Sequence, residues 1–205
     1  MKVLMINGSP RPKGNTATAL AEMERVFDAE GIEVETVQIG NKDIRGCIAC
    51  GTCGERGACV FDDVVNEIAV KFEQADGLVV ATPVYYASPN ATVIALLDRL
   101  FYSAKFDKTM KVGASIAVAR RAGTTATLDV VNKYFSFAGM PVAPSKYWNV
   151  AHGAKPGEVV QDEEGMQIMR TLARNMAFLM KSIALGKEAY GLPEKEPGIM
   201  TNFVR

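Results

Sequence analysis

Short apolar runs alternate with longer amphipathic stretches along the whole chain. The apolar runs predict strands at residues 3–6, 34–39, 77–82, 112–119 and 146–150. The other stretches place apolar residues three and four positions apart, which predicts helices at about 16–30, 62–75, 90–103, 124–138 and 163–185. Continuous apolar strands that alternate with helices indicate a parallel sheet covered by helices on both faces.

Five such strands suggest an α/β fold of the flavodoxin type. In this fold a doubly wound, five-stranded parallel sheet binds its ligand at the carboxyl ends of the strands. We find no internal repeat and no low-complexity linker, so residues 1–186 are predicted to form one flavodoxin-like domain. Residues 187–205 contain two prolines and many charges, and we interpret them as a C-terminal tail or an arm that contacts another subunit.

Composition narrows the classes of function. The chain has 205 residues, of which 48% are apolar, and its formal net charge is zero. This length is sufficient for one domain with a well-buried core, and the neutral balance argues against nucleic-acid or acidic-membrane partners. Neither a signal-peptide pattern nor an apolar run of about 20 residues is present. We therefore expect a cytoplasmic protein whose four cysteines do not form structural disulfides.

The first predicted strand leads through a loop rich in glycine, serine, asparagine and threonine into a helix. Unpaired N–H groups and the helix dipole make such a junction suitable for a phosphate. Ser9, Asn15 and Thr16 add side-chain donors, and Arg11 adds a charged fork. Gly14 is not followed by the Lys-Ser/Thr of a triphosphate-binding loop, which favours a phosphate monoester. The alternative is an ordinary loop in which Asn15 or Thr16 caps the helix.

The loops after the third and fourth predicted strands should lie at the same edge of the sheet. Two prolines stiffen the first of them, Tyr85 and Tyr86 offer flat ring faces, and the small Ser88 allows close approach of a ligand. The second loop combines Arg120 and Arg121 with a helix start. Each loop alone would suit a structural role, but three loops at one edge favour a single binding site.

These motifs resemble a known family. Gly8-Ser9-Pro10-Arg11 through Gly14-Asn15-Thr16, together with Thr82–Pro89, look like the motifs of flavodoxin-like NAD(P)H-dependent FMN reductases, over about residues 1–185. The resemblance implies that the FMN phosphate lies on the loop that contains Ser9, Arg11, Gly14, Asn15 and Thr16. It implies that Pro83, Val84, Tyr85, Tyr86 and Ser88 run along the isoalloxazine, with Arg120, Arg121 and Gly123 on its other side. It also implies a homodimer or homotetramer.

All four cysteines lie within thirteen residues, with the spacing C-x2-C-x2-C-x5-C at Cys47, Cys50, Cys53 and Cys59. Four thiolates this close suit an iron–sulfur cluster or a zinc ion, and the compact run favours [4Fe–4S] over zinc. The spacing resembles that of the iron–sulfur flavoproteins of anaerobes, a branch of the same family, which implies that all four cysteines ligate a cluster that exchanges electrons with FMN. The alternative is a loop of free thiols that pack as small hydrophobes.

Other conspicuous residues are assigned structural roles. We interpret His152 as a loop residue, with a role as proton donor at the ligand edge as the alternative. Trp148 is predicted to lie in the core or in a subunit interface, and the pair Asp62-Asp63 is predicted to cap a helix. Four methionines of the last helix share one face and predict packing: Met166, Met169, Met176 and Met180.

We expect a flavin oxidoreductase in which the flavin supplies the chemistry, so no side chain is predicted to be a catalytic acid, base or nucleophile. Three hypotheses for the function remain open. The first is an iron–sulfur flavoprotein that passes single electrons between a ferredoxin-like protein and an acceptor. The second is an NAD(P)H-dependent FMN or quinone reductase without a cluster. The third is a flavodoxin-like electron carrier. The cysteine run favours the first.

Overall fold

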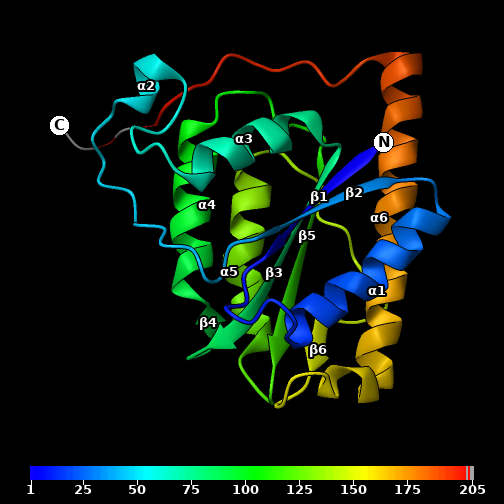
Figure 1. Cartoon of the computed structure of the whole chain (residues 1–205). Coiled ribbons are helices and arrows are strands. Elements are labelled where there is room, and N and C mark those ends of the chain that lie inside the picture. The colour runs from blue at the N-terminus through cyan, green and yellow to red at the C-terminus, as the bar shows by residue number, and fades with distance from the viewer. Residues whose placement is uncertain (202, 204–205) are drawn as a thin grey trace.

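Five parallel strands form the centre of the computed structural model, which describes residues 1–201 and 203. Their order across the sheet is β2-β1-β3-β5-β6, the flavodoxin order, so the predicted fold class is confirmed (Figure 1). The strands are β1 (Lys2–Asn7), β2 (Glu33–Gln38), β3 (Gly77–Tyr85), β5 (Val112–Ala119) and β6 (Val150–His152). A two-residue strand, β4 (Ser88–Pro89), pairs antiparallel with the end of β3.

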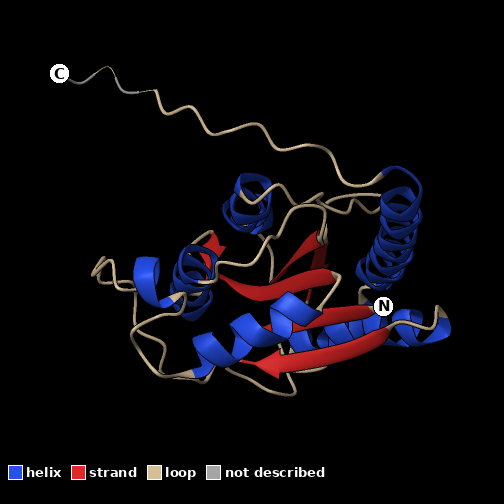
Figure 2. Cartoon of the chain, turned by 90° about the horizontal axis from the view of Figure 1, so that it is seen from above, coloured by secondary structure: helices blue, strands red, loops and turns tan. Residues whose placement is uncertain are grey.

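Long helices cover both faces of the sheet, as Figure 2 shows from above. One face carries α1 (Asn15–Ala29) and α6 (Glu163–Tyr190), which pack against each other. The other face carries α3 (Val64–Gln74), α4 (Ala91–Ser103) and α5 (Thr124–Phe137). Two short helices, α2 (Cys53–Arg56) and η1 (Glu158–Gln161), lie in connections.

The double layer of helices explains the continuous apolar strands. Side chains alternate between the two faces, so Val3 and Met5 of β1 pack with α1 and α6, while Leu4 and Ile6 pack with the helices of the opposite face. All eight residues of β5 are buried. The four methionines of α6 are buried in the first of these layers, which confirms their predicted packing role.

The fifth strand differs from its prediction. It begins at Val150 and pairs with β5 over only three residues, from Ala117↔Val150 to Ala119↔His152. The preceding chain contacts β5 through a bridge between Gly113 and Val142 and then leaves the sheet. It returns at Asn149, whose carbonyl accepts from the Ala117 amide at 3.1 Å. Trp148 is 58% exposed, so it does not lie in the core, and its alternative place in a subunit interface stays a prediction.

The last helix is longer than predicted. Helix α6 continues past residue 186 to Tyr190, and the following segment crosses the top of the molecule in Figure 1. Lys195 of this segment pairs with Asp107 at 2.6 Å. The division of the chain at residue 186 stays a prediction.

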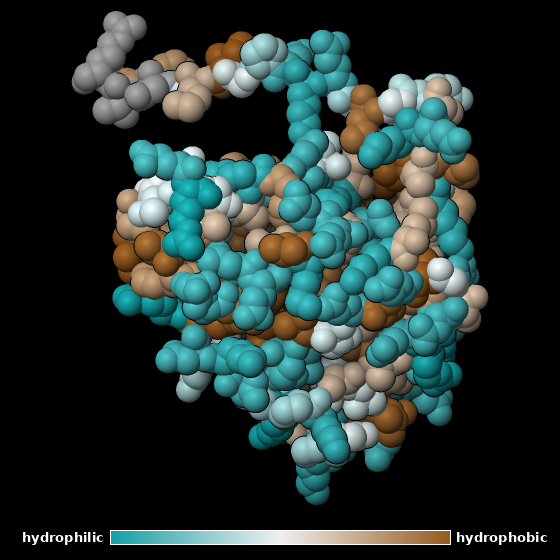
Figure 3. Space-filling model, turned by 45° about the horizontal axis from the view of Figure 1, so that its top comes forward, coloured by the Kyte–Doolittle hydropathy of each residue, from teal (hydrophilic) through white to brown (hydrophobic). Residues whose placement is uncertain are grey.

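No helix in the described part of the chain is both long enough and apolar enough to span a membrane. On the face drawn in Figure 3, hydrophilic side chains dominate, and hydrophobic ones gather in small patches between them.

Candidate functional site

The loops that follow β1 and β3 are joined at the lower edge of the sheet in Figure 1. The amide of Gly8 donates to the carbonyl of Ala81 at 2.8 Å. The buried Asn90, at the start of α4, donates from Nδ2 to the Gly8 carbonyl at 2.8 Å, while its Oδ1 accepts from the Val93 amide and caps the helix. Asn90 therefore holds the loop after β1 against the loop after β3. This role was not predicted from the sequence.

Ser9 is held in place by its neighbours. Its amide donates to Asn7 Oδ1 at 3.0 Å, and its carbonyl accepts a hydrogen bond from the side chain of Gln38. Its Oγ accepts from the Arg11 amide at 3.2 Å. Because Oγ acts as the acceptor in this turn, the hydroxyl keeps its own proton for an anionic ligand.

The start of α1 lacks a side-chain cap. Its N-cap is Gly14, whereas Asp63, Asn90 and Asp162 cap α3, α4 and α6 with their side chains. The alternative in which Asn15 or Thr16 caps α1 is therefore wrong. Without such a cap, the first N–H groups of α1 can bind an anion.

Asn15 uses both ends of its amide within the protein. Nδ2 donates to the Lys155 carbonyl at 3.0 Å, and Oδ1 accepts from the Val159 amide at 3.3 Å. The side chain thus links the first loop to the connection between β6 and α6. Its predicted contact with a phosphate stays a prediction.

The loop after the third strand is a β-hairpin, which the sequence analysis did not predict. Tyr86 and Ala87 form its turn with φ of 51° and 57°, in the left-handed region that two-residue hairpins require. Both residues carry a Cβ, so the turn is strained. Gly123 (φ 86°) packs against it, since a Cβ there would lie 2.7 Å from Ala87 Cα. This contact joins the hairpin after β3 to the loop between β5 and α5.

The predicted flavin-binding residues fall into two groups by burial. Buried or half-buried are Ser9, Gly14, Asn15, Thr16, Pro83, Val84, Ser88 and Gly123. Exposed are Arg11, Tyr85, Tyr86, Arg120 and Arg121. The first group can form the walls of a site, and the exposed side chains can reach a bound anion or ring from its rim.

The four cysteines lie in the segment between β2 and α3 and line one pocket. Cys53 and Cys59 are buried, whereas Cys47 and Cys50 are exposed. Hydrogen bonds from the side chain and then the backbone of Thr52 hold the pKa of the Cys50 thiol below its usual range. Within residues 1–201 and 203, no three or more His, Cys, Asp or Glu side chains converge closely enough to hold a metal ion.

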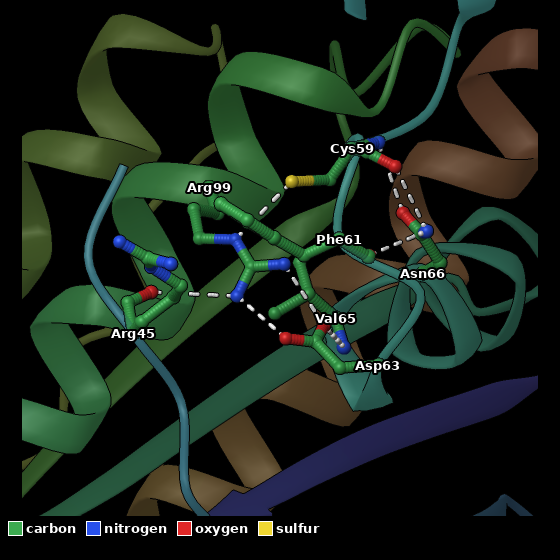
Figure 4. Close-up of polar contacts among 7 residues, drawn as sticks. All are labelled: Arg45, Cys59, Phe61, Asp63, Val65, Asn66 and Arg99. Atoms are coloured by element: carbon green, nitrogen blue, oxygen red, sulfur yellow. Dashed lines mark hydrogen bonds and ion pairs between the residues drawn. The ribbon is translucent and has the colours of Figure 1, made fainter. Parts of the chain in front are cut away.

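A buried arginine of α4 lies against this pocket (Figure 4). Arg99 is 1% exposed and donates from Nε to Cys59 Sγ at 3.2 Å. Its two terminal nitrogens bind the Asp63 carboxylate at 2.7 and 2.9 Å, and Nη1 also donates to the Arg45 carbonyl at 3.3 Å. Burial works to lower the pKa of Arg99, but the hydrogen bonds to Asp63 and Cys59 outweigh it and raise the pKa.

Asn66 fixes the backbone of Cys59. Its Oδ1 accepts from the Cys59 amide at 3.0 Å, and its Nδ2 donates to the Cys59 and Phe61 carbonyls, both at 3.1 Å (Figure 4). Asp63 also accepts from the Val65 amide, so its predicted role as a helix cap is confirmed. Neither Arg99 nor Asn66 was predicted from the sequence, although a single arginine among the apolar residues of α4 is a signal of a buried polar role.

His152 ends β6 and lies beside Asp162. Its amide donates to Asp162 Oδ2 at 2.7 Å, and its Nδ1 lies 3.4 Å from the same oxygen. Asp162 also accepts from the Gly165 amide at the start of α6. The contacts of His152 thus join β6 to α6, which is a structural role.

Comparison with known proteins identifies the family. Residues 1–155 match the family model of NADPH-dependent FMN reductases. The chain belongs to this family. The chain is therefore a flavin-dependent oxidoreductase, and FMN is the cofactor that the family supports.

Two relatives match this chain over about nine tenths of its length. An iron-sulfur flavoprotein of Methanocaldococcus jannaschii is 34% identical over 191 residues, which span 89% of this chain and 99% of the relative. One of Methanosarcina thermophila is 32% identical over 192 residues, 92% of this chain and 100% of the relative. A flavodoxin from the domain Archaea shares the fold, with a TM-score of 0.59 at 14% identity over 88% of this chain and 99% of that one.

Proposed function

We propose that this flavin-dependent oxidoreductase carries a [4Fe–4S] cluster on Cys47, Cys50, Cys53 and Cys59 and passes electrons between a redox partner and an acceptor. The observation that carries the proposal is the single pocket lined by all four cysteines and backed by the guanidinium of Arg99. The names of the two relatives, both iron-sulfur flavoproteins, support it.

The first loop fits the phosphate end of FMN. Ser9 keeps a hydroxyl proton to donate, and the uncapped first turn of α1 offers its N–H groups. Helix α5 also begins at a glycine, Gly123, without a side-chain cap, next to the Tyr86 hairpin. These residues would hold the phosphate and line the ring. Bound FMN would supply the exchange of hydride or electrons.

The cysteine pocket fits a cluster by the chemistry of its donors. Four thiolates match the usual ligand set of a [4Fe–4S] cluster, and the buried guanidinium supplies positive charge beside the sulfurs. Ser103 Oγ, buried on the same pocket, has no hydrogen-bond partner among the described residues. A bound cluster would supply one-electron transfer.

A second candidate is an NAD(P)H-dependent FMN reductase without a cluster. The family model bears the description NADPH-dependent FMN reductase, and within the described residues no ready-made metal-binding group is found. In this case Cys53 and Cys59 would pack as small hydrophobes, and the exposed Cys47 and Cys50 would be free thiols.

The experiment that separates the two candidates is anaerobic purification followed by cluster reconstitution, with iron and sulfide analysis and a visible spectrum. We expect about four irons and four sulfides per chain, as the cluster formula requires. Cys53→Ala should remove the long-wavelength absorption and leave FMN bound. Ser9→Ala combined with Thr16→Ala should weaken FMN binding and leave the iron content unchanged. Less than about one iron per chain after reconstitution would exclude the cluster and favour the second candidate.

We also propose a homodimer or homotetramer. Tyr147 and Trp148 are both exposed and border a groove between α5 and the segment before β6. An exposed pair of aromatic side chains is typical of a protein contact. Light scattering after size-exclusion chromatography should give a smaller mass for Trp148→Ser than for the unaltered protein. A monomeric mass for the unaltered protein would contradict this assembly.

A further inference from the structure

Helix α4 presents two polar side chains to the cysteine pocket. Arg99 and Ser103 are four residues apart, on one face of the helix, and both line the pocket. They are almost fully buried, at 1% and 2% exposure. Buried polar groups in a folded protein normally find a partner, so the environment of each side chain needs an explanation.

Arg99 contacts the cysteine segment at three points. It binds the carbonyl of Arg45 before the first cysteine, the sulfur of Cys59, and the carboxylate of Asp63 after the last cysteine. Asp63 receives both terminal nitrogens and so fixes the plane of the guanidinium. This leaves Nε directed at the sulfur of Cys59.

Ser103 is the reverse case, because its hydroxyl has no partner. Among the residues that the structure describes, Ser103 Oγ is one of two buried side-chain atoms without a hydrogen bond. A buried hydroxyl without a partner destabilises the folded protein. A sulfur acceptor in the pocket would remove this destabilisation.

We propose that Arg99 and Ser103 are positioning residues of the cluster, with the Arg99 Nε–H directed to the Cys59 sulfur and the Ser103 hydroxyl to a sulfur in the same pocket. The inference rests on the cluster in the proposed function. Donors aimed at cluster sulfurs stabilise the reduced, more negative state. The two side chains therefore raise the reduction potential of the cluster and slow its loss.

The competing explanation is that Arg99 only closes the segment and that Ser103 has no function. A purely structural role predicts lower stability on substitution, but no change in the potential of a cluster that remains bound. The two explanations differ in spectroscopic and potentiometric readouts, so enzyme activity is not needed to separate them.

The test uses Arg99→Lys and Ser103→Ala, with Arg56→Lys as the control. Arg56 is an exposed arginine of the same segment. Each reconstituted protein is titrated anaerobically while the reduced cluster is followed by electron paramagnetic resonance. The rate of bleaching by a chelator and the melting temperature of the metal-free protein are measured in parallel.

We expect Arg99→Lys to favour the oxidised cluster about tenfold, a shift of about 59 mV to lower potential for one electron, and to bleach about tenfold faster. Ser103→Ala should shift the potential in the same direction by less. Its metal-free form should melt at the same or a higher temperature, because an unsatisfied hydroxyl is removed. Arg56→Lys should match the unaltered protein.

Two results would overturn the inference. If Arg99→Lys and Ser103→Ala retain a cluster with the potential and bleaching rate of the unaltered protein, the positioning role is wrong while the proposed cluster stands. If the unaltered protein takes up no cluster, the cluster and the positioning role fail together.

Discussion

The predicted phosphate loop (residues 8–16) and the cysteine segment (residues 42–63) are built in different ways. The first is bound to the sheet by backbone hydrogen bonds, such as Gly8 to Ala81, and by the buried Asn90. From Lys42 to Asp63, the backbone hydrogen bonds of the cysteine segment are local, such as Lys42 to Ile39 and Gly57 to Cys53. The side chains of Arg99 and Asn66 connect it to the helices. The two sites contact opposite ends of α4.

The first site is therefore held largely by the sheet, whereas the second is held mainly by side chains that reach it from the helices. The contacts that hold the predicted phosphate loop come from Ala81, Asn90 and Gln38, which belong to the sheet and to the start of α4. The cysteine segment is held mainly by the Arg99–Asp63 ion pair and by the hydrogen bonds of Asn66, and bound metal would order it further. Damage to one site should therefore leave the other largely intact.

The strongest test of this independence is Asp63→Ala. This change leaves the buried Arg99 guanidinium without its carboxylate partner and removes the side-chain cap of α3, and we expect a loss of about 3 kcal/mol in the free energy of unfolding. Urea denaturation of the metal-free protein measures it. Lys195→Ala, which breaks an exposed pair, should cost less than about 1 kcal/mol. Folded Asp63→Ala protein should still bind FMN, and loss of FMN binding from it would contradict the independence of the sites.

The second test overpacks the phosphate loop with Gly40→Ala. A Cβ at Gly40 would lie 2.1 Å from the backbone carbon of Ser9, so the loop must move. We expect about 2–3 kcal/mol of destabilisation and a weaker affinity for FMN in a fluorescence titration. The control is Gly46→Ala in the cysteine segment, where the added Cβ meets nothing within 4 Å. Unchanged FMN affinity in Gly40→Ala would show that Ser9 does not position the phosphate.

The third test removes two hydroxyls from the same loop. Ser9→Ala combined with Thr16→Ala should weaken FMN binding by about 1–3 kcal/mol, because hydrogen bonds to a charged group are lost. Thr18→Ala is the control, since Thr18 already donates to the Gly14 carbonyl within the helix. Equal FMN affinities for the double variant and the control would show that the FMN phosphate does not bind to this loop.

The smallest effect concerns the nicotinamide donor. Arg120 and Arg121 are exposed at the predicted ring edge, and the sequence shows no dedicated site for a 2′-phosphate. We expect NADPH and NADH to differ by less than about tenfold in kcat/KM, or 1.4 kcal/mol. Steady-state kinetics decide this point. A hundredfold preference would reveal a missed phosphate site, and turnover with neither donor would favour a ferredoxin-type donor.

The order of the long helices and of the five parallel strands could be read from the sequence alone, whereas β4 and the two short helices could not. Hydrophobic periodicity is a local property, so the bounds of β5 agree with the prediction and those of β1, β2 and α1 differ from it by one residue. The strand–loop–helix junction after β1 and the spacing of the four cysteines were also legible in the sequence, because each is complete within a few consecutive residues.

The contacts between these elements could be seen only in the folded protein. The hairpin turn at Tyr86 lacks the glycine that usually marks such a turn, and it is held by packing against Gly123. Arg99 lies 40 positions from Cys59, and Asn15 lies 144 positions from Val159. Contacts across such separations leave no periodic trace in the sequence. They depend on which faces of the helices the folded sheet brings together.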